Sequence, residues 1–360
     1  MTILDYIKKY GDYTFLEKEF NEVDNVIFSV LTYVNFDSVI SKNKKLKKTI
    51  NAVANEYFLK HPKKENKKII SSKKNGLKIL DAIKNKRRYK DLLLYNYLYI
   101  GSENQQFSAL TIRINKSTIY ISFEGTDGLI SGWEEDAKMT YLFPVEAQKN
   151  AIKYLNGYSA TKDKIILGGH SKGGNLALVS AMYCTSSIKN RILKIYNNDG
   201  PGLRLKQIES YRYKLVNKKL IHLIPNYSVV GLLLRHKKYI VIKSNKKSIL
   251  AHNPLTWIVK NNTFERTELS KFSLVLDESI SKWLNKYDDT IREKLVITLF
   301  DICRNIDLKD LVEIKKNKLL LIKLLISVKN INPEVKEIVR DLISMINICS
   351  KNYNKEIDAK

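Results

Sequence analysis

The spacing of hydrophobic positions changes along the chain and divides it into regions. In residues 1–40, apolar side chains recur at mostly helical intervals, which predicts one or two helices. Residues 41–90 keep apolar side chains at intervals within a lysine-rich sequence, so basic amphipathic helix is expected there rather than a disordered tail. Residues 284–360 again show helical spacing and are expected to form a packed helical appendage.

The centre of the chain has short β-branched and aromatic runs instead. Residues 107–114 alternate apolar and polar side chains, and residues 117–125 follow after a short turn as their hairpin partner. Further runs of this kind predict strands at residues 164–171, 191–199, 219–225 and 239–244. Helical segments precede and follow the first of these. Because strands that alternate with helices are typical of a mainly parallel sheet covered on both faces, we expect an α/β domain over residues 1–283.

The composition is that of a globular protein. The chain has 360 residues, of which 44% are hydrophobic, so disorder, collagen-like repeats and disulfide miniproteins do not describe the whole. The cysteines, Cys184, Cys303 and Cys349, are widely separated and lack the spacing of a structural zinc site.

Neither end of the chain nor its interior shows a membrane or export signal. The N-terminus has charged residues where a signal peptide needs an apolar segment, and no stretch reaches the ~18 uninterrupted apolar residues of a membrane span. We therefore expect a cytoplasmic protein.

The net charge of +26 is concentrated in two segments. Residues 41–90 hold 18 Lys and Arg against 3 Asp and Glu, and residues 203–249 hold 12 against 1, so the rest of the chain is neutral. Such a field would attract anionic lipid, nucleic acid or an acidic protein, whereas the alternative is a solubilising surface. Nucleic acid is the less favoured partner, since the sequence lacks RNA-binding and helix-turn-helix signatures. If the two basic segments bind a partner, we expect that partner to be the inner face of an anionic membrane, which the protein would contact peripherally.

The pentapeptide Gly169–Gly173, GHSKG, is the strongest chemical signal. It has the pattern G-x-S-x-G and lies between a predicted strand and a predicted helix, which is the setting of a nucleophile elbow. In such a turn the serine is strained, and glycines let the strand and the helix approach closely. We therefore predict that Ser171 is a nucleophile with positive φ; the alternative is an ordinary glycine-rich turn.

A serine hydroxyl needs a base to remove its proton and a third group to orient that base. His252 lies in a loop after Ser171 and is the predicted base, with a capping or surface histidine as the alternative. Asp199 ends a predicted strand and is the predicted acid, because α/β active sites form at the carboxyl ends of parallel strands. Its alternative role is an Asx turn before Gly-Pro. His170 is expected to be a packing residue.

A tetrahedral oxyanion needs preorganised N–H donors. The backbone N–H of Lys172, directly after the serine, is the first expected donor. The second is the N–H of Thr126, in the segment FEGTD that ends a strong strand. Such a site requires neither a metal nor a cofactor.

Several spaced motifs occur together in one order along the chain: ISFEGTD, GWEEDAKM, GGHSKGGNLAL, YNNDGPG, SVVGLLL and AHNPLTW. Over most of the first 300 residues they resemble the motif series of a bacterial family of α/β-hydrolases that is similar to class 3 lipases. The resemblance implies an α/β-hydrolase-like fold, with Ser171 as nucleophile and His252 as base. It also implies that Thr126 and Lys172 form the oxyanion hole.

The chain departs from that pattern at two positions. Glu124 stands where the family usually has Arg, which removes or reverses a structural salt bridge. Class 3 lipases take their acid from an Asp-x-Val-Pro motif before the histidine, whereas the comparable segment here, residues 225–231, has Ser228. Asp199 must therefore supply the carboxylate, or the acid is missing.

Two functions from different classes follow. The first is a serine hydrolase of carboxylic esters, acting on acyl lipid or another apolar acyl ester; a thioesterase or a peptidase would use the same residues. The second is a weakly active or degenerate hydrolase scaffold whose basic segments bind an anionic membrane or nucleic acid.

Overall fold

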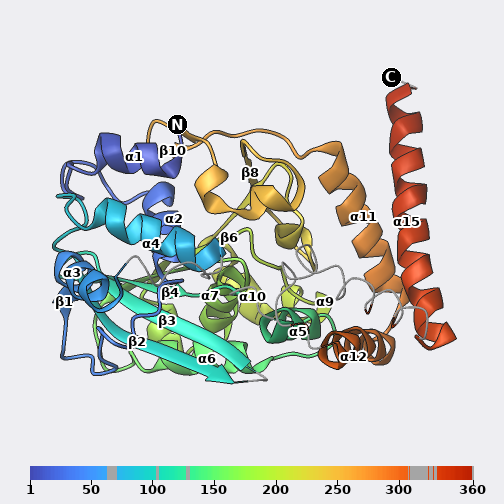
Figure 1. Cartoon of the computed structure of the whole chain (residues 1–360), viewed down its shortest axis with the longest axis horizontal. Helices are drawn as coiled ribbons and strands as arrows, with labels where there is room; N and C mark the ends of the chain where they lie inside the picture. Colours follow the sequence, from blue (N-terminus) through green and yellow to red (C-terminus); the bar gives the residue numbers. More distant parts are fainter. Residues whose placement is uncertain are drawn as a thin grey trace.

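A sheet of eight strands crosses the molecule in the computed structural model of the chain (Figure 1). The structure describes residues 1–62, 71–102, 105–126, 130–306, 308, 323, 327 and 331–358. In order across the sheet, the strands are β1 (Lys48–Thr49), β2 (Leu93–Ser102), β3 (Gln105–Arg113), β4 (Thr118–Phe123), β5 (Lys164–His170), β6 (Ile192–Asn198), β7 (Leu220–Pro225) and β8 (Ile240–Ile242). A separate small sheet pairs β9 (Val259–Lys260) with β10 (Thr263–Phe264).

The strand directions divide the sheet into two parts. Strands β1 to β4 pair antiparallel, because short connections join β2 to β3 and β3 to β4. Strands β4 to β8 pair parallel, as is usual where helices connect successive strands. The expected mainly parallel sheet flanked by helices, an α/β-hydrolase-like architecture, is therefore confirmed.

Strand β2 is one of the elements that the hydrophobic pattern did not predict. Its register with β3 shifts between Tyr95 and Leu98, and Asn96 has a φ of 52°. A bulge of this kind breaks the alternation of side chains along a strand. The period of two is therefore lost within the sequence of β2, although the strand has ten residues.

Helices cover both faces of the sheet. On one face lie α1 (Ile3–Tyr10), α2 (Glu22–Leu31), α3 (Ile50–Lys60) and α4 (Ser71–Ile83). On the other lie α6 (Glu146–Asn156), α7 (Lys172–Tyr183), α8 (Ser186–Lys189) and α10 (Tyr211–Asn217). Along β4, Ile119 and Ile121 pack with α6 and α7, whereas Tyr120 packs with the N-terminal helices. The helices predicted in residues 1–90 are thus confirmed for the described residues and cover one face of the sheet; residues 63–70 lie outside that description.

The C-terminal region is helical where the structure describes it. It contains α11 (Lys271–Lys286), α12 (Asp289–Asn305) and α15 (Pro333–Asp358). Trp283 of α11 packs with Val335 and Ile338 of α15, and the two helices run alongside each other at the edge of the molecule (Figure 1). The boundary predicted between residues 283 and 284 falls within α11.

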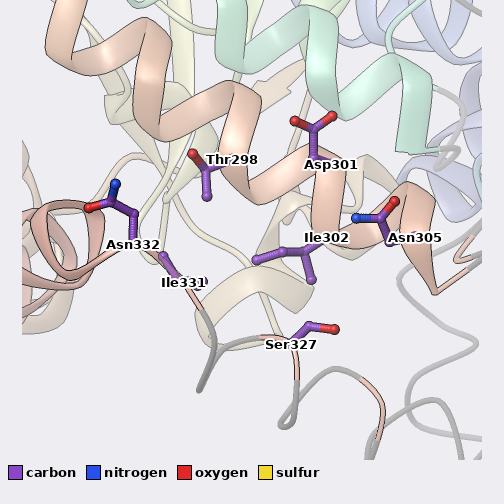
Figure 2. A pocket seen from close by; sticks show the side chains of 7 residues that line it. All are labelled: Thr298, Asp301, Ile302, Asn305, Ser327, Ile331 and Asn332. Atoms are coloured by element: carbon purple, nitrogen blue, oxygen red, sulfur yellow. The ribbon is translucent and has the colours of Figure 1, made fainter.

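The appendage also contacts the helix that follows the Thr126 loop, α5 (Ile130–Lys138). Arg304 of α12 forms an ion pair with Glu134, and Ile306 packs against Ile130. A cavity of about 340 Å³ lies within the appendage, between α12 and the residues before α15, and Thr298 and Asn332 contribute to its wall (Figure 2). None of the residues predicted from the sequence to do chemistry lines this cavity.

The connections after β6 carry shorter helices. They are α9 (Leu205–Ile208), the 3-10 helix η2 (Val230–Leu232), and two further 3-10 helices, η3 (Ser248–His252) and η4 (Pro254–Thr256). In the described part of the chain, no helix combines the length and apolar character that crossing a bilayer requires.

Candidate active site

Ser171 occupies the turn between the end of β5 and the start of α7. Its φ is 58° and its ψ is −134°, a combination that is strained for a residue with a side chain. The backbone N–H of Ser171 donates to the carbonyl of Asn198 at 3.0 Å, which ties the turn to the neighbouring strand. The predicted strand–turn–helix setting and the positive φ are both present.

The glycines of the elbow are required by close packing. A Cβ on Gly173 would lie 2.1 Å from the carbonyl oxygen of Phe123, and one on Gly169 would lie 2.3 Å from the backbone of Gly173. Both contacts are with backbone atoms, which cannot move aside as a side chain can. The pattern of small residues around Ser171 therefore follows from the approach of α7 to β4 and β5.

His252 ends η3 and contacts Asp199, which follows β6. Nδ1 of His252 lies 2.6 Å from Oδ2 of Asp199, and the carboxylate is completely buried. Since a carboxylate accepts, Nδ1 carries the proton and Nε2 is left with a free lone pair. Burial raises the pKa of Asp199, although the hydrogen bond from His252 opposes this effect.

The second oxygen of Asp199 is also occupied. Ser228 Oγ donates to Oδ1 at 2.5 Å, and the N–H of Gly231 donates to the same atom at 3.1 Å. Ser228 is the residue that stands where the lipase-like pattern would have its acid. The serine side chain is long enough to donate to a carboxylate that comes from the end of β6. Ser228 therefore does not replace the acid but stabilises Oδ1 of Asp199.

His252 lies against His170, the residue that directly precedes Ser171. The rings of His170 and His252 have centroids 4.5 Å apart. The two described side chains of Ser171 and His252 are not hydrogen-bonded to each other. Catalytic hydrogen bonds are often long without ligand and tighten when substrate binds.

The loop that leads to Thr126 lies against the elbow. A Cβ on the preceding residue, Gly125, would lie 3.0 Å from the Cβ of Ser171 and 2.5 Å from the carbonyl oxygen of His170. The backbone N–H of Lys172 opens α7, where the first amides have no partner within the helix. Within the described residues, neither the N–H of Thr126 nor that of Lys172 donates to another protein group. Both donors therefore remain available beside Ser171.

Thr126 is in turn held by Asp136 of α5. Its Oγ1 donates to Oδ2 of Asp136 at 2.5 Å, and Oδ1 of that carboxyl group is buried without a hydrogen-bond partner among the described residues. Burial raises the pKa of Asp136 to about 6, although the charge of Lys172 acts in the opposite direction. Asp136 could not be predicted as a partner of Thr126, because no spacing rule relates the two residues.

The side chain of Lys172 is buried beneath the elbow. Its Nζ lies 3.0 Å from Glu135 Oε2 and donates to the carbonyl of Gln106 at 3.1 Å. Burial alone would lower the pKa of Lys172, but the neighbouring Asp136, Glu135 and Glu124 outweigh it and raise the pKa. Glu124, which stands where the resembled motif series has Arg, is buried. Its charge interacts favourably with the ammonium group of Lys172.

We predict that Asp136→Asn makes the protein more stable at neutral pH. The folded-state pKa of about 6 exceeds the ordinary 3.8, so the folded chain holds this proton more tightly than the unfolded chain. The free energy of unfolding of the wild-type protein should therefore fall by about 3 kcal/mol as the pH rises from below 3.8 to above about 6. The asparagine variant should gain about that amount at pH 7.5 and almost nothing at pH 4, measured by urea unfolding. An equal gain in stability at both pH values would contradict the raised pKa of Asp136.

A chain of hydrogen bonds links the N-terminal region to His252. Tyr33, which follows α2, places its hydroxyl 2.9 Å from Nδ1 of His170, and Nε2 of His170 lies 2.8 Å from the carbonyl oxygen of His252. Since a carbonyl only accepts, Nε2 of His170 carries the proton and Nδ1 accepts from Tyr33. Burial lowers the pKa of His170 well below its ordinary value, so this ring stays neutral beside His252. His170, expected to be a packing residue, thus also orients the backbone of His252.

We predict that Tyr33→Phe lowers kcat about tenfold with little change in KM, because a buried hydrogen bond that positions His252 is lost. Tyr158→Phe is the matched control. Its hydroxyl is also buried and is bonded to Asn96 and Thr111, but it lies among residues that pack with α6, away from His252. Steady-state kinetics should show a kcat defect for the first variant alone, while both lose a similar amount of stability. Equal kcat values for the two variants would rule out the positioning role.

Residues 83–301 match the family described as Mbeg1-like. Among solved structures, the chain is similar to M37 lipase, with 14% identity, a TM-score of 0.36, and coverage of 59% of this chain and 70% of that chain. It is also similar to a fungal lipase in an inhibitor complex, with 15% identity, a TM-score of 0.34, and coverage of 62% and 82%. No curated protein matches the sequence.

The described residues contain no group of three or more His, Cys, Asp or Glu side chains that could hold a metal ion. The side chains gathered around Ser171 are instead an imidazole, carboxyl groups and hydroxyl groups. The imidazole and the carboxyl groups can move protons, and the hydroxyl groups can donate to an oxyanion.

Proposed function

The chain belongs to the Mbeg1-like family, and we propose that it is a serine hydrolase that cleaves carboxylic esters. One observation carries the proposal: His252 contacts the buried carboxylate of Asp199 at 2.6 Å beside a serine with positive φ. A strained serine, a histidine with Nε2 free and a buried acid are the parts that activate a hydroxyl nucleophile.

In the proposed mechanism, Ser171 Oγ attacks the ester carbonyl while Nε2 of His252 takes its proton. Asp199 holds the imidazole in the required tautomer and stabilises the imidazolium. The N–H groups of Thr126 and Lys172 bind the tetrahedral oxyanion. His252 then protonates the leaving alcohol, and water releases the acyl group from Ser171 by the same steps in reverse order.

The proposed substrates are acyl lipids or other esters with an apolar acyl group. A thioester or a peptide would use the same residues, so the leaving group has to be tested directly. Hydrolysis of p-nitrophenyl acetate, butyrate, octanoate and palmitate should proceed with kcat/KM rising with chain length. An acyl thioester of matched chain length and a peptide anilide should be cleaved at least tenfold more slowly. Faster cleavage of either would change the substrate class.

The alternative is a hydrolase scaffold that has lost activity and serves only to bind a partner. That alternative rests on Ser228, at the position where the acid was expected, and on the two Lys-rich segments. The contact of Asp199 with His252, and the hydrogen bond that Ser228 donates to Asp199, favour the enzyme. An absence of hydrolysis with all of these substrates would favour the scaffold.

A further inference from the structure

The segment that leads into His252 carries an exposed patch that the proposed reaction does not use. Residues 245–250, Asn-Lys-Lys-Ser-Ile-Leu, are all exposed. Ile249 is 50% exposed and Leu250 is 65% exposed. Single exposed apolar side chains need no explanation, but two adjacent ones beside a candidate active site point to a contact partner.

Positive charge accompanies the two apolar side chains. Lys246 and Lys247 lie on the same exposed segment, separated from Ile249 by Ser248, and the ammonium group of neither lysine forms an ion pair or a hydrogen bond with the described residues. Residues 237–252 contain five lysines and no Asp or Glu. The charge next to Ile249 and Leu250 is therefore uncompensated by the local sequence.

A second basic element lies beside this segment. Asn75 of α4 donates from Nδ2 to Oδ1 of Asn253 at 2.9 Å, and Asn253 directly follows His252. Lys74 and Lys78 are exposed on α4, one turn apart. Helix α4 comes from the basic segment 41–90, and η3 begins at the end of the basic segment 203–249. The fold thus brings parts of both basic segments to the neighbourhood of His252.

We propose that residues 245–250, together with Lys74 and Lys78, form a docking surface for an anionic lipid bilayer. The lysines contact the lipid headgroups, and Ile249 and Leu250 enter the boundary between headgroups and acyl chains. Nucleic acid would attract the lysines equally but would leave the apolar pair without a partner, because binding to its backbone is electrostatic.

The docking surface has a consequence for the substrate. It places His252 next to the layer in which acyl esters are found, so it rests on the proposed function and identifies the substrate as an ester within a membrane. The docking itself requires no chemistry. Binding can therefore be measured with the full chain carrying Ser171→Ala, so that the lipids stay intact.

Sedimentation with vesicles tests the docking surface. The Ser171→Ala protein should bind vesicles of 70% phosphatidylcholine and 30% phosphatidylserine, and bind pure phosphatidylcholine much more weakly. Binding should weaken as salt rises from 10 to 150 mM, because the Debye length falls from about 30 Å to about 8 Å. Equal binding to both kinds of vesicle, or no binding to either, would overturn the proposal. So would binding to a short DNA duplex but not to vesicles.

Two double variants locate the surface. Lys246→Gln with Lys247→Gln should weaken partitioning about thirtyfold at low salt, the change that corresponds to ~1 kcal/mol per lysine. Ile249→Ser with Leu250→Ser should weaken it about tenfold at both salt concentrations, since the apolar contribution is not screened. Retention of wild-type binding by both double variants would overturn the proposal.

Matched controls come from other surfaces of the molecule. Lys162 and Lys164 are exposed at the amino end of β5, and Leu16 and Leu59 are 98% and 83% exposed. Lys162→Gln with Lys164→Gln, and Leu16→Ser with Leu59→Ser, should bind as the parent does. If the control variants lost as much vesicle binding as the test variants, binding would not be confined to residues 245–250, Lys74 and Lys78.

A separate measurement keeps the two proposals distinguishable. In protein with Ser171 intact, the four double variants should hydrolyse a water-soluble ester at the wild-type rate, since none alters the residues around Ser171. If vesicle binding fails while hydrolysis persists, the docking surface is wrong and the proposed function stands. If hydrolysis is absent while vesicle binding persists, the proposed function is wrong and the docking surface stands.

Discussion

Replacing Ser171 by alanine is expected to lower ester hydrolysis about 10⁶-fold, to the residual rate that binding and oxyanion stabilisation alone provide. The change removes only the hydroxyl group, and the backbone keeps its place because the N–H of Ser171 still donates to Asn198. The measurement is kcat for a p-nitrophenyl ester, followed with enough protein to detect the residual rate.

Ser180→Ala provides the matched control for this variant. Ser180 is buried on α7, and its hydroxyl donates to the carbonyl of Ala177 within the same helix. It should keep wild-type kcat. If Ser171→Ala retained more than about 1% of the activity, another residue would have to be the nucleophile.

Asp199→Asn is expected to lower kcat by about 10⁴, the effect seen when the acid of a serine triad becomes an amide. The amide keeps the size of the side chain but can present its NH₂ group to Nδ1 of His252, which then carries its proton on Nε2 and cannot act as a base. Because KM depends little on the tautomer, the loss should be in kcat. Steady-state kinetics separate the two parameters.

Ser228→Ala is the companion variant. It removes a hydrogen bond to one oxygen of Asp199 but leaves the N–H of Gly231 and the contact with His252 in place. We expect kcat to fall about tenfold, the effect of losing one hydrogen bond to a charged group. If Asp199→Asn fell within tenfold of wild type, a different carboxylate would have to orient His252.

The parts of the fold that the sequence could predict are those set by local pattern. The strand β5, the glycines beside Ser171 and the helix α7 form one continuous segment, so periodicity and glycine spacing locate the turn. Asp199 was predicted for a related reason, because it directly follows a strand, where α/β active sites form.

The remaining contacts join residues far apart in the sequence, and no local pattern encodes them. Tyr33 and His170 are separated by 137 positions, yet their hydrogen bond orients the backbone of His252. The interaction of Ser228 with Asp199 depends on how the end of β7 approaches the end of β6. Asp136 reaches Thr126 only because α5 folds back over the loop that precedes it. Each contact is specified by tertiary packing.

Reaction with a fluorophosphonate tests most directly whether Ser171 is an activated nucleophile. The reagent phosphonylates a serine only when a base increases the reactivity of its hydroxyl, and it requires no knowledge of the natural substrate. Mass spectrometry of the digested wild-type protein should find the modification on Ser171 alone, and its rate should fall sharply in Asp199→Asn. A protein that remains unlabelled, or one labelled at a different residue, would contradict the account.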